Sequence, residues 1–311
     1  MDIYQLRYFV AVAETGNFTK AAARTNISQP SLSQQILNLE EEIGRKLFHR
    51  LSRKATLTDA GQLLLERARR IISEADNTLR ELKEEPARGH RVAVGAIPTL
   101  AHFFLPAVVA HCQANEIPIR LRSHENFRDA VVSAVLDGEL DWGLVALPVG
   151  DPRLEIVRLF TEPLLLAISA SHPLAIAETI NFAALQNQNF ILMGSASTLA
   201  AQVQRLGGDY DFLPNVTHRC AQLTTVKALT AMGLGVSILP QSARHASDPA
   251  GLVYRKFTAP IPTRDIALVR HRHRHMSKGA ELFAEAARAV VGPSPETQRG
   301  KPRTATAGRV R

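Results

Sequence analysis

The most constraining feature of the sequence is a set of three short amphipathic helices, separated by very short breaks, at its start. Apolar residues recur at helical spacing over residues 2–14, which predicts the first helix. An alanine-rich second helix is expected over 18–25. Asn26 follows it, where a tight turn needs the left-handed backbone that asparagine tolerates. Ser28 is a good N-cap for a third helix that should end at Gly44.

A small hairpin and one long helix are expected next. Two short extended pieces flank a basic tip within residues 46–57, a pattern typical of a β-hairpin wing. Thr58 should then cap a helix that reaches about residue 85. Apolar residues along this helix fall at steps of three and four, the heptad spacing of a helix that pairs with another helix. The predicted dimerisation seam consists of Leu65, Ala68, Ile72, Ala75, Leu79 and Leu82.

Beyond a polar hinge the pattern changes to strands that alternate with helices. This alternation predicts an α/β domain with a largely parallel sheet, a class that binds small molecules at its strand ends. The expected strands are 92–97, 117–121, 142–147, 164–169, 190–193, 236–239 and 266–269, and a last helix is expected over 278–291. We therefore divide the chain into an N-terminal domain of three helices and a wing (1–58), a linker helix with its hinge (59–89), an α/β domain (90–292) and a disordered basic tail (293–311).

Charge and cysteine content exclude several classes of protein. Most of the formal net charge of +8 belongs to residues 260–311, so the basic composition alone is weak evidence for nucleic-acid binding. The apolar runs are too short for a membrane span, and the first residues lack the pattern of a secretory signal, so we expect a cytoplasmic protein with no membrane partner. Cys112 and Cys220 lie outside any zinc-binding spacing, and no metal or other cofactor is expected.

The start of the third helix carries side chains suited to reading DNA. In a helix-turn-helix, the second helix places its N-terminal residues against base edges in the major groove. Glutamine can bond adenine, and cations on the wing can follow the phosphates or enter the minor groove. The alternative is an ordinary capped helix beside a solvated basic loop, but the turn, wing and long helix together favour DNA. The candidates are Lys20, Ser28, Gln29, Pro30, Ser31, Ser33, Gln34, Arg50 and Arg53, and Lys20 fits either a phosphate contact or a solvent-facing charge.

These motifs resemble the N-terminal domain of the LysR-type transcriptional regulators, over residues 6–14, 18–22, 27–36, 47–50 and 57–61. The resemblance implies a winged helix-turn-helix, a dimerising linker helix and a two-lobed effector domain like that of periplasmic binding proteins. It implies a homodimer or homotetramer on double-stranded promoter DNA and a small-molecule effector held between the lobes. RNA polymerase is left open as a further partner.

Three strand-to-helix junctions form the candidate effector site. Backbone N–H groups at helix starts, with nearby hydroxyls, can hold an anionic or polar ligand, whereas the alternative is that Ser and Thr only cap these helices. The candidates are Pro98, Thr99, Leu100, Ser195, Ser197, Thr198, Cys220, Gln222 and Thr224. Cys220 fits either a pocket wall or core packing.

Segment 95–99, followed by 104–106, is similar to the hydrogen-peroxide-sensing branch of the family. That similarity implies a sensing cysteine followed by leucine, and this chain has Thr198 there, so no disulfide switch is expected. His271, His273 and His275 alternate with arginines. On an extended strand they would share one face, and we interpret them as a solvated strand end rather than a metal site.

Two other classes of function fit the sequence less well. An enzyme is disfavoured because the α/β half has no GxSxG, P-loop, GxGxxG or HExxH motif. A solute receptor is disfavoured because there is no export signal and there is a DNA-binding front end. The prediction is therefore a ligand-responsive transcriptional regulator and not an enzyme.

Overall fold

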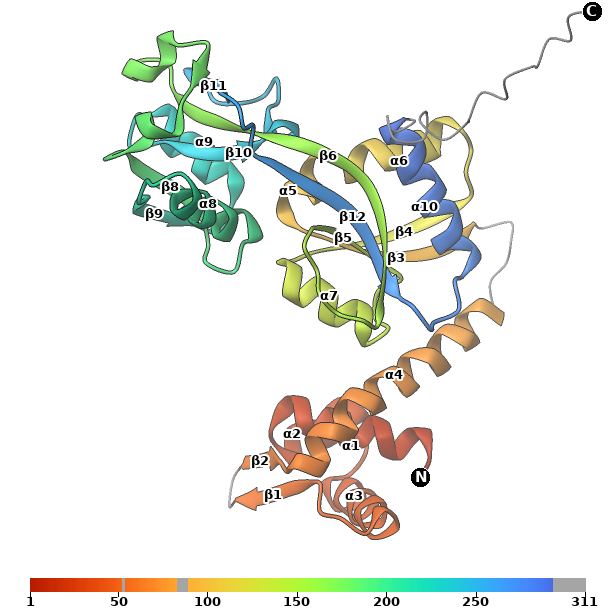
Figure 1. Ribbon diagram of the computed structural model, residues 1–311. Helices are drawn as coiled ribbons and strands as arrows, with labels where there is room; N and C mark the ends of the chain where they lie inside the picture. The colour runs from red at the N-terminus through yellow and green to blue at the C-terminus, as the bar shows by residue number, and fades with distance from the viewer. Residues whose placement is uncertain (52–53, 83–88, 293–311) are drawn as a thin grey trace, which may run out of the picture. The chain divides into compact units, whose positions relative to one another are not determined.

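The computed structural model describes residues 1–51, 54–82 and 89–292. The chain divides into two compact units: the first holds the N-terminal elements with segment 133–141, and the second holds the other described residues. Figure 1 shows the order of their helices and strands. The expected tail at 293–311 lies outside the described residues, and so do residues 83–88, which hold the expected end of the long helix and most of the expected hinge at 86–90. No helix within those described ranges is both long and apolar enough to cross a membrane.

The N-terminal unit has the predicted succession of three helices, a hairpin and a long helix. Asp2 and Gln5 form a capping box at the start of α1, Asn26 adopts the expected left-handed conformation (φ 55°), and Thr58 accepts a hydrogen bond from Gly61 N at 3.0 Å. Helix and strand ends thus follow local sequence signals. The elements are α1 (Ile3–Thr15), α2 (Phe18–Thr25), α3 (Gln29–Ile43), β1 (Phe48–Leu51), β2 (Lys54–Leu57) and α4 (Asp59–Leu82).

One core joins these helices and corrects the predicted seam of α4. Leu65 and Ala68 are buried in the same cluster as Phe9, Leu32 and Leu39. They are therefore not available to a partner helix, because they already pack within their own chain. Heptad spacing and the ordinary amphipathic spacing both use steps of three and four, so the sequence alone could not separate the two uses.

The start of α4 lies very close to the chain that enters the wing. A Cβ atom at Gly61 would stand 2.2 Å from the carbonyl oxygen of Leu47. That carbonyl also accepts a hydrogen bond from Thr58 N at 3.0 Å. Position 61 therefore requires glycine for close backbone approach and not for an unusual φ angle.

The first lobe of the second unit is built on three parallel strands, β3 (His90–Ala96), β4 (Ile119–Glu125) and β5 (Trp142–Ala146). Trp142 Nε1 donates to Ala280 O at 2.8 Å, which fixes α10 against this sheet. The helices here are α5 (Pro98–Phe103), α6 (Leu105–Ala114) and α10 (Lys278–Val291), the last with the predicted bounds, and α7 (Arg128–Leu136), whose residues from 133 onward are grouped with the first unit.

Two long antiparallel strands, β6 (Leu154–Ser169) and β12 (Thr263–His271), run from the first lobe into the second (Figure 1). We call them the hinge strands. The second lobe adds β10 (Ser237–Pro240) and β11 (Leu252–Phe257), both antiparallel to β6. Its remaining elements are β7 (Thr179–Ile180), the parallel pair β8 (Asn189–Met193) and β9 (Asn215–Cys220), α8 (Thr198–Asp209), α9 (Leu223–Ala231), and the short 3₁₀ helices η2 (Pro173–Ile176), η3 (Phe182–Leu185) and η4 (Gln241–Ala243).

The two-lobed α/β architecture is confirmed, but the prediction of a largely parallel sheet was wrong. The eight-stranded sheet is mixed, because both hinge strands are antiparallel to their neighbours. The prediction also missed the first part of β6, where buried and exposed residues alternate in a weak pattern. β12 ends at His271 and the chain then turns, so His271, His273 and His275 do not share one face of an extended strand.

Candidate DNA-reading surface and ligand pocket

The start of α3 presents a row of exposed polar side chains. Ser28 caps the helix by accepting a hydrogen bond from Ser31 N at 3.2 Å. Gln29 Nε2 donates to Ser33 Oγ at 2.8 Å, and Gln34 Nε2 donates to Asn38 Oδ1 at 2.9 Å. The opposite face of the helix is fully buried, through Leu32, Ile36 and Leu39 among others. The predicted residues therefore share one exposed, hydrogen-bonding surface; they are Ser28, Gln29, Pro30, Ser31, Ser33 (half-buried) and Gln34.

A buried carboxylate that the sequence analysis did not single out joins α3 to the wing. Glu40 is 2% exposed, and its Oε1 accepts hydrogen bonds from Leu47 N at 2.8 Å and Phe48 N at 3.3 Å. Its Oε2 pairs with Lys46 Nζ at 3.0 Å. The carboxylate thereby satisfies two backbone donors at the start of β1 and fixes the wing relative to α3.

The predicted cations of this surface are described only in part. Lys20 is exposed in the first turn of α2. Arg53 lies outside the described residues, and so does the side chain of Arg50, whose backbone belongs to β1. Their roles stay predictions.

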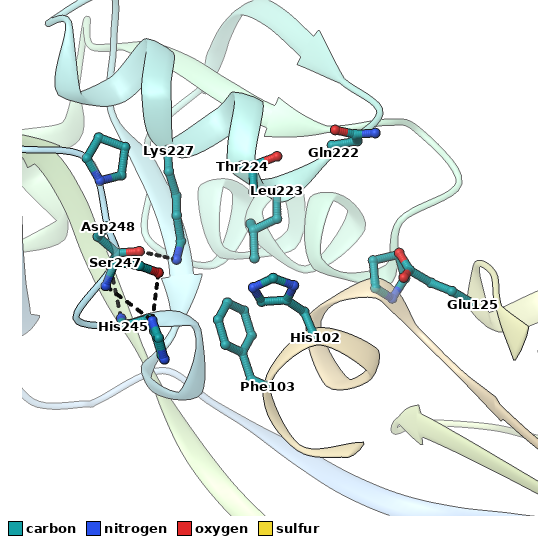
Figure 2. A pocket seen from close by; sticks show the side chains of 12 residues that line it. His102, Phe103, Glu125, Gln222, Leu223, Thr224, Lys227, His245, Ser247 and Asp248 are labelled. Carbon is teal, nitrogen blue, oxygen red and sulfur yellow. Dashed lines mark hydrogen bonds and ion pairs between the residues drawn. The ribbon is translucent and has the colours of Figure 1, made fainter. Parts of the chain in front are cut away.

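A pocket of about 400 Å³ opens in the second unit between α5 of the first lobe and α9 of the second (Figure 2). His102 and Phe103 face it from α5, and Gln222, Leu223 and Thr224 face it from the start of α9. Gln222 is the N-cap of α9 and makes no side-chain capping bond. The other lining residues are Pro98, Glu125, Lys227, His245, Ser247, Asp248 and Pro249.

A buried ion pair forms one wall of this pocket. Lys227, which is 5% exposed, pairs with Asp248 (Figure 2). It also donates to Ala243 O. Asp248 also accepts from Tyr254 Oη at 2.7 Å and from His245 N at 3.0 Å. Burial alone would raise the pKa of Asp248, but these hydrogen bonds outweigh it and hold the pKa below its usual value. Burial and the Asp248 carboxylate together raise the pKa of Tyr254.

Only some of the predicted effector residues line this pocket. Pro98, Gln222 and Thr224 do, whereas Ser195, Ser197, Thr198 and Cys220 do not. Thr99 and Leu100 are buried and do not line this pocket, which corrects their assignment to it, because α5 lines the pocket with Pro98, His102 and Phe103 and packs Thr99 and Leu100 into the protein. Lys227, Asp248 and His245 were missed because no local motif marks them, and they meet only through folding.

Thr99 takes part in a second buried network, at the hinge strands. Glu162 on β6 and Arg264 on β12 are cross-strand partners, joined by Arg264 Nε–Glu162 Oε1 at 2.9 Å. Arg264 Nη1 donates to Thr99 Oγ1 of the first lobe at 3.0 Å, and Glu162 Oε2 accepts from Ser242 N of the second lobe at 2.8 Å. Burial lowers the pKa of the Arg264 guanidinium, which the Glu162 carboxylate opposes. The network therefore links both lobes through their hinge.

The cysteines and histidines considered for redox or metal chemistry do not come together in a cluster. Cys112 and Cys220 are both buried and unpaired, and burial raises the pKa of each thiol. His271 Nδ1 accepts a hydrogen bond from His273 N at 3.2 Å, so these two imidazoles are not arranged along a strand face. Among the residues that the structure describes, no group of three or more His, Cys, Asp or Glu side chains could hold a metal ion.

Comparison with known proteins gives a consistent result over nearly the whole chain. Residues 3–62 match the family model "Bacterial regulatory helix-turn-helix protein, lysR family", and residues 85–292 match "LysR substrate binding domain". The DNA-binding transcriptional dual regulator OxyR of Escherichia coli is 32% identical over 297 residues, which cover 93% of this chain and 95% of that protein.

Two solved structures are similar in fold to this chain. Full-length OxyR from Pseudomonas aeruginosa, in a variant with one cysteine replaced by aspartate, superposes with a TM-score of 0.68 at 28% identity, covering 93% of this chain and 98% of that one. Full-length CbnR, complexed with its target DNA, gives 0.67 at 26% identity and covers 93% and 100% of the two chains.

Proposed function

The chain belongs to the LysR family of bacterial regulatory helix-turn-helix proteins, and from this premise we propose which of its surfaces read DNA, pair subunits and bind the effector. The protein is a DNA-binding transcriptional regulator with an effector-binding domain, and not an enzyme. Our assignment of the DNA-reading surface rests on the exposed polar side chains at the start of α3, because the opposite face of this helix is buried in the core. We infer that it acts in the cytoplasm, at promoters that RNA polymerase also uses.

Gln29 is the residue we assign to base recognition. Its side chain is exposed at the first position of α3, and its Nε2 is held by Ser33 Oγ. A carboxamide in this position can exchange that contact for a bidentate bond to adenine, worth about 1–3 kcal/mol of discrimination. Lys20, Arg50 and Arg53 would supply phosphate contacts, which add affinity that is independent of sequence and sensitive to salt.

Replacing Gln29 by alanine should weaken binding to the cognate site by about tenfold or more and leave binding to unrelated DNA nearly unchanged. Gel shifts at fixed salt, with duplexes from the region upstream of the protein's own gene and with scrambled duplexes, measure both affinities. Gln62→Ala is the matched control, because Gln62 is also an exposed glutamine but belongs to α4 and not to the exposed polar row of α3. Equal affinities of the two variants for the cognate duplex would contradict the assignment.

The outer part of α4 supports a homodimer, or a homotetramer built from dimers. Ile71, Leu79 and Leu82 on α4 are all more than 40% exposed. Of the predicted seam, Ala75 is half-buried and Ile72 packs against the domain core, so pairing would rest on the last positions, Ala75, Leu79 and Leu82, with Ile71 beside them.

The effector is assigned to the pocket between α5 and α9. About 400 Å³ lies within the range of small-molecule sites, and apolar walls from Phe103 and Leu223 accompany polar groups from Gln222 and Thr224. The uncapped first turn of α9 offers backbone N–H donors, which favour a polar or anionic group on the ligand. An effector bound to residues of both lobes would bias their relative arrangement if it bound one arrangement more tightly.

A panel of small metabolites, screened by thermal shift on the full chain, should yield compounds that raise its melting temperature by mass action. Thr224→Trp should abolish the shift of such a compound, because the indole would fill the pocket that Thr224 lines. Thr225→Trp is the control, since the next residue is exposed and does not line the pocket. A compound whose shift survives in Thr224→Trp binds elsewhere and would remove this pocket from the proposal.

A further inference from the structure

A second cavity, of about 390 Å³, lies in the same unit and shares no lining residue with the pocket in Figure 2. Its walls come from the loop after β5 (Leu147, Pro148 and Val149), from both hinge strands and from α8 of the second lobe. The polar lining contains three arginines, Arg158, Arg205 and Arg264, but only one carboxylate, Asp265. The cavity is therefore cationic.

The three arginines differ in whether a carboxylate of the protein already pairs with their guanidinium group. Arg158 Nη1 pairs with Asp265 at 3.1 Å, and Arg264 pairs with the buried Glu162. Arg205 is exposed and makes no hydrogen bond or ion pair with any of the residues that the structure describes. One guanidinium charge at the cavity is therefore left unmatched.

One further observation concerns how Arg205 is positioned, and another points to a missing acceptor at the cavity. Gln202 Nε2 donates to Thr263 O at 2.7 Å, which ties α8 to the hinge strand, and Arg205 lies one turn further along α8. The buried Arg264 Nη2 lies 2.8 Å from Glu162 Oε1 but makes no well-directed hydrogen bond within the described residues. Buried donors of this kind are usually satisfied, and guanidinium groups bind carboxylates with two parallel hydrogen bonds.

We propose that this cavity is a second ligand site, beyond the effector pocket, that binds a small organic carboxylate. The carboxylate binds Arg205, with Arg158 beside it, and the hydrocarbon part of the ligand packs on Leu147, Pro148 and Val149. Because Arg205 belongs to the second lobe and the apolar loop to the first, a ligand that contacts both holds the lobes at one relative angle.

Hexanoate is a suitable probe, because it combines one carboxylate with a short apolar chain. Isothermal titration of the full chain, at an ionic strength fixed with sodium chloride, should show saturable binding of hexanoate. Hexanamide has nearly the same shape without the charge, and it should bind at least tenfold more weakly. Absence of saturable hexanoate binding, or equal affinity for hexanamide, would overturn the proposal.

Arg205→Gln should raise the Kd for hexanoate by about tenfold or more, the usual cost of losing a charged hydrogen bond. Arg219→Gln is the matched control: Arg219 is exposed on β9 of the same lobe, outside the cavity, and its loss changes the net charge equally. Equal Kd values for the two variants would reveal non-specific charge binding and refute the site. Gel shifts of the unaltered chain test DNA binding separately, so the two proposals fail on different measurements.

Discussion

Replacing Glu162 by alanine should lower the free energy of unfolding of the effector-binding unit by about 3–5 kcal/mol. Glu162 is 6% exposed and Arg264 is 3% exposed, so the substitution leaves a buried guanidinium without its counterion. It also leaves Ser242 N without the acceptor that it now has at 2.8 Å. The protein has one tryptophan, Trp142, which is buried in this unit, so its fluorescence during denaturant unfolding measures the change.

The same two strands provide a control for this prediction. Glu155 and Arg270 are also cross-strand partners on β6 and β12, at 3.3 Å, but the side chain of Glu155 is 44% exposed. Water screens such a pair, so Glu155→Ala should cost no more than about 1 kcal/mol. If both variants unfolded at the same denaturant concentration, burial would not be what makes the Glu162–Arg264 pair important.

The network of Glu162 and Arg264 also bears on how a ligand signal could cross the protein. Arg264 reaches Thr99 on α5, whose neighbour Pro98 lines the pocket in Figure 2. Glu162 reaches η4 at Ser242, next to Ala243, whose carbonyl accepts from Lys227 in that pocket. A change in the angle between the lobes must therefore either preserve or break these buried bonds, which favours a small number of discrete arrangements over a continuous range.

Replacing Glu40 by alanine should destabilise the DNA-binding unit by about 2–5 kcal/mol and reduce its affinity for DNA. The substitution leaves the backbone N–H groups of Leu47 and Phe48 without this carboxylate as acceptor, in a part of the chain where both residues are buried. Because these two residues lead into β1, the wing should lose its fixed position relative to α3. Differential scanning calorimetry of the full chain, with gel shifts below the transition, measures both effects.

Two further variants test whether the loss of stability comes from the buried Glu40 carboxylate itself. Glu41→Ala removes the next carboxylate, which is exposed, and should change stability by no more than about 0.5 kcal/mol. Glu40→Gln keeps an oxygen that can accept from both N–H groups, and it should recover much of the lost stability. A thermal transition in Glu40→Ala that matches that of Glu41→Ala would show that the buried carboxylate does not hold the wing.

The N-terminal unit could be predicted from sequence because its signals are local. Phe18–Thr25 formed the expected helix, Ser28 and Thr58 capped as expected, and Asn26 took the left-handed conformation. Each of these outcomes depends on residues within about one helical turn, so the chain carries the information in consecutive positions. The last helix, at 278–291, was predictable for the same reason.

Side-chain partners were decided only by the tertiary structure. By their spacing, Leu65 and Ala68 fit a dimer seam, but in the structure they pack in one core with residues of α1–α3. Thr99 fits a ligand site in the sequence, but its hydroxyl accepts a hydrogen bond from Arg264, 165 positions away along the chain. The sequence determined where the helices and the wing form and which kind of protein they make. The tertiary structure decided which face each helix buries and which distant charges meet, because those contacts depend on the free energy of packing segments that no local pattern connects.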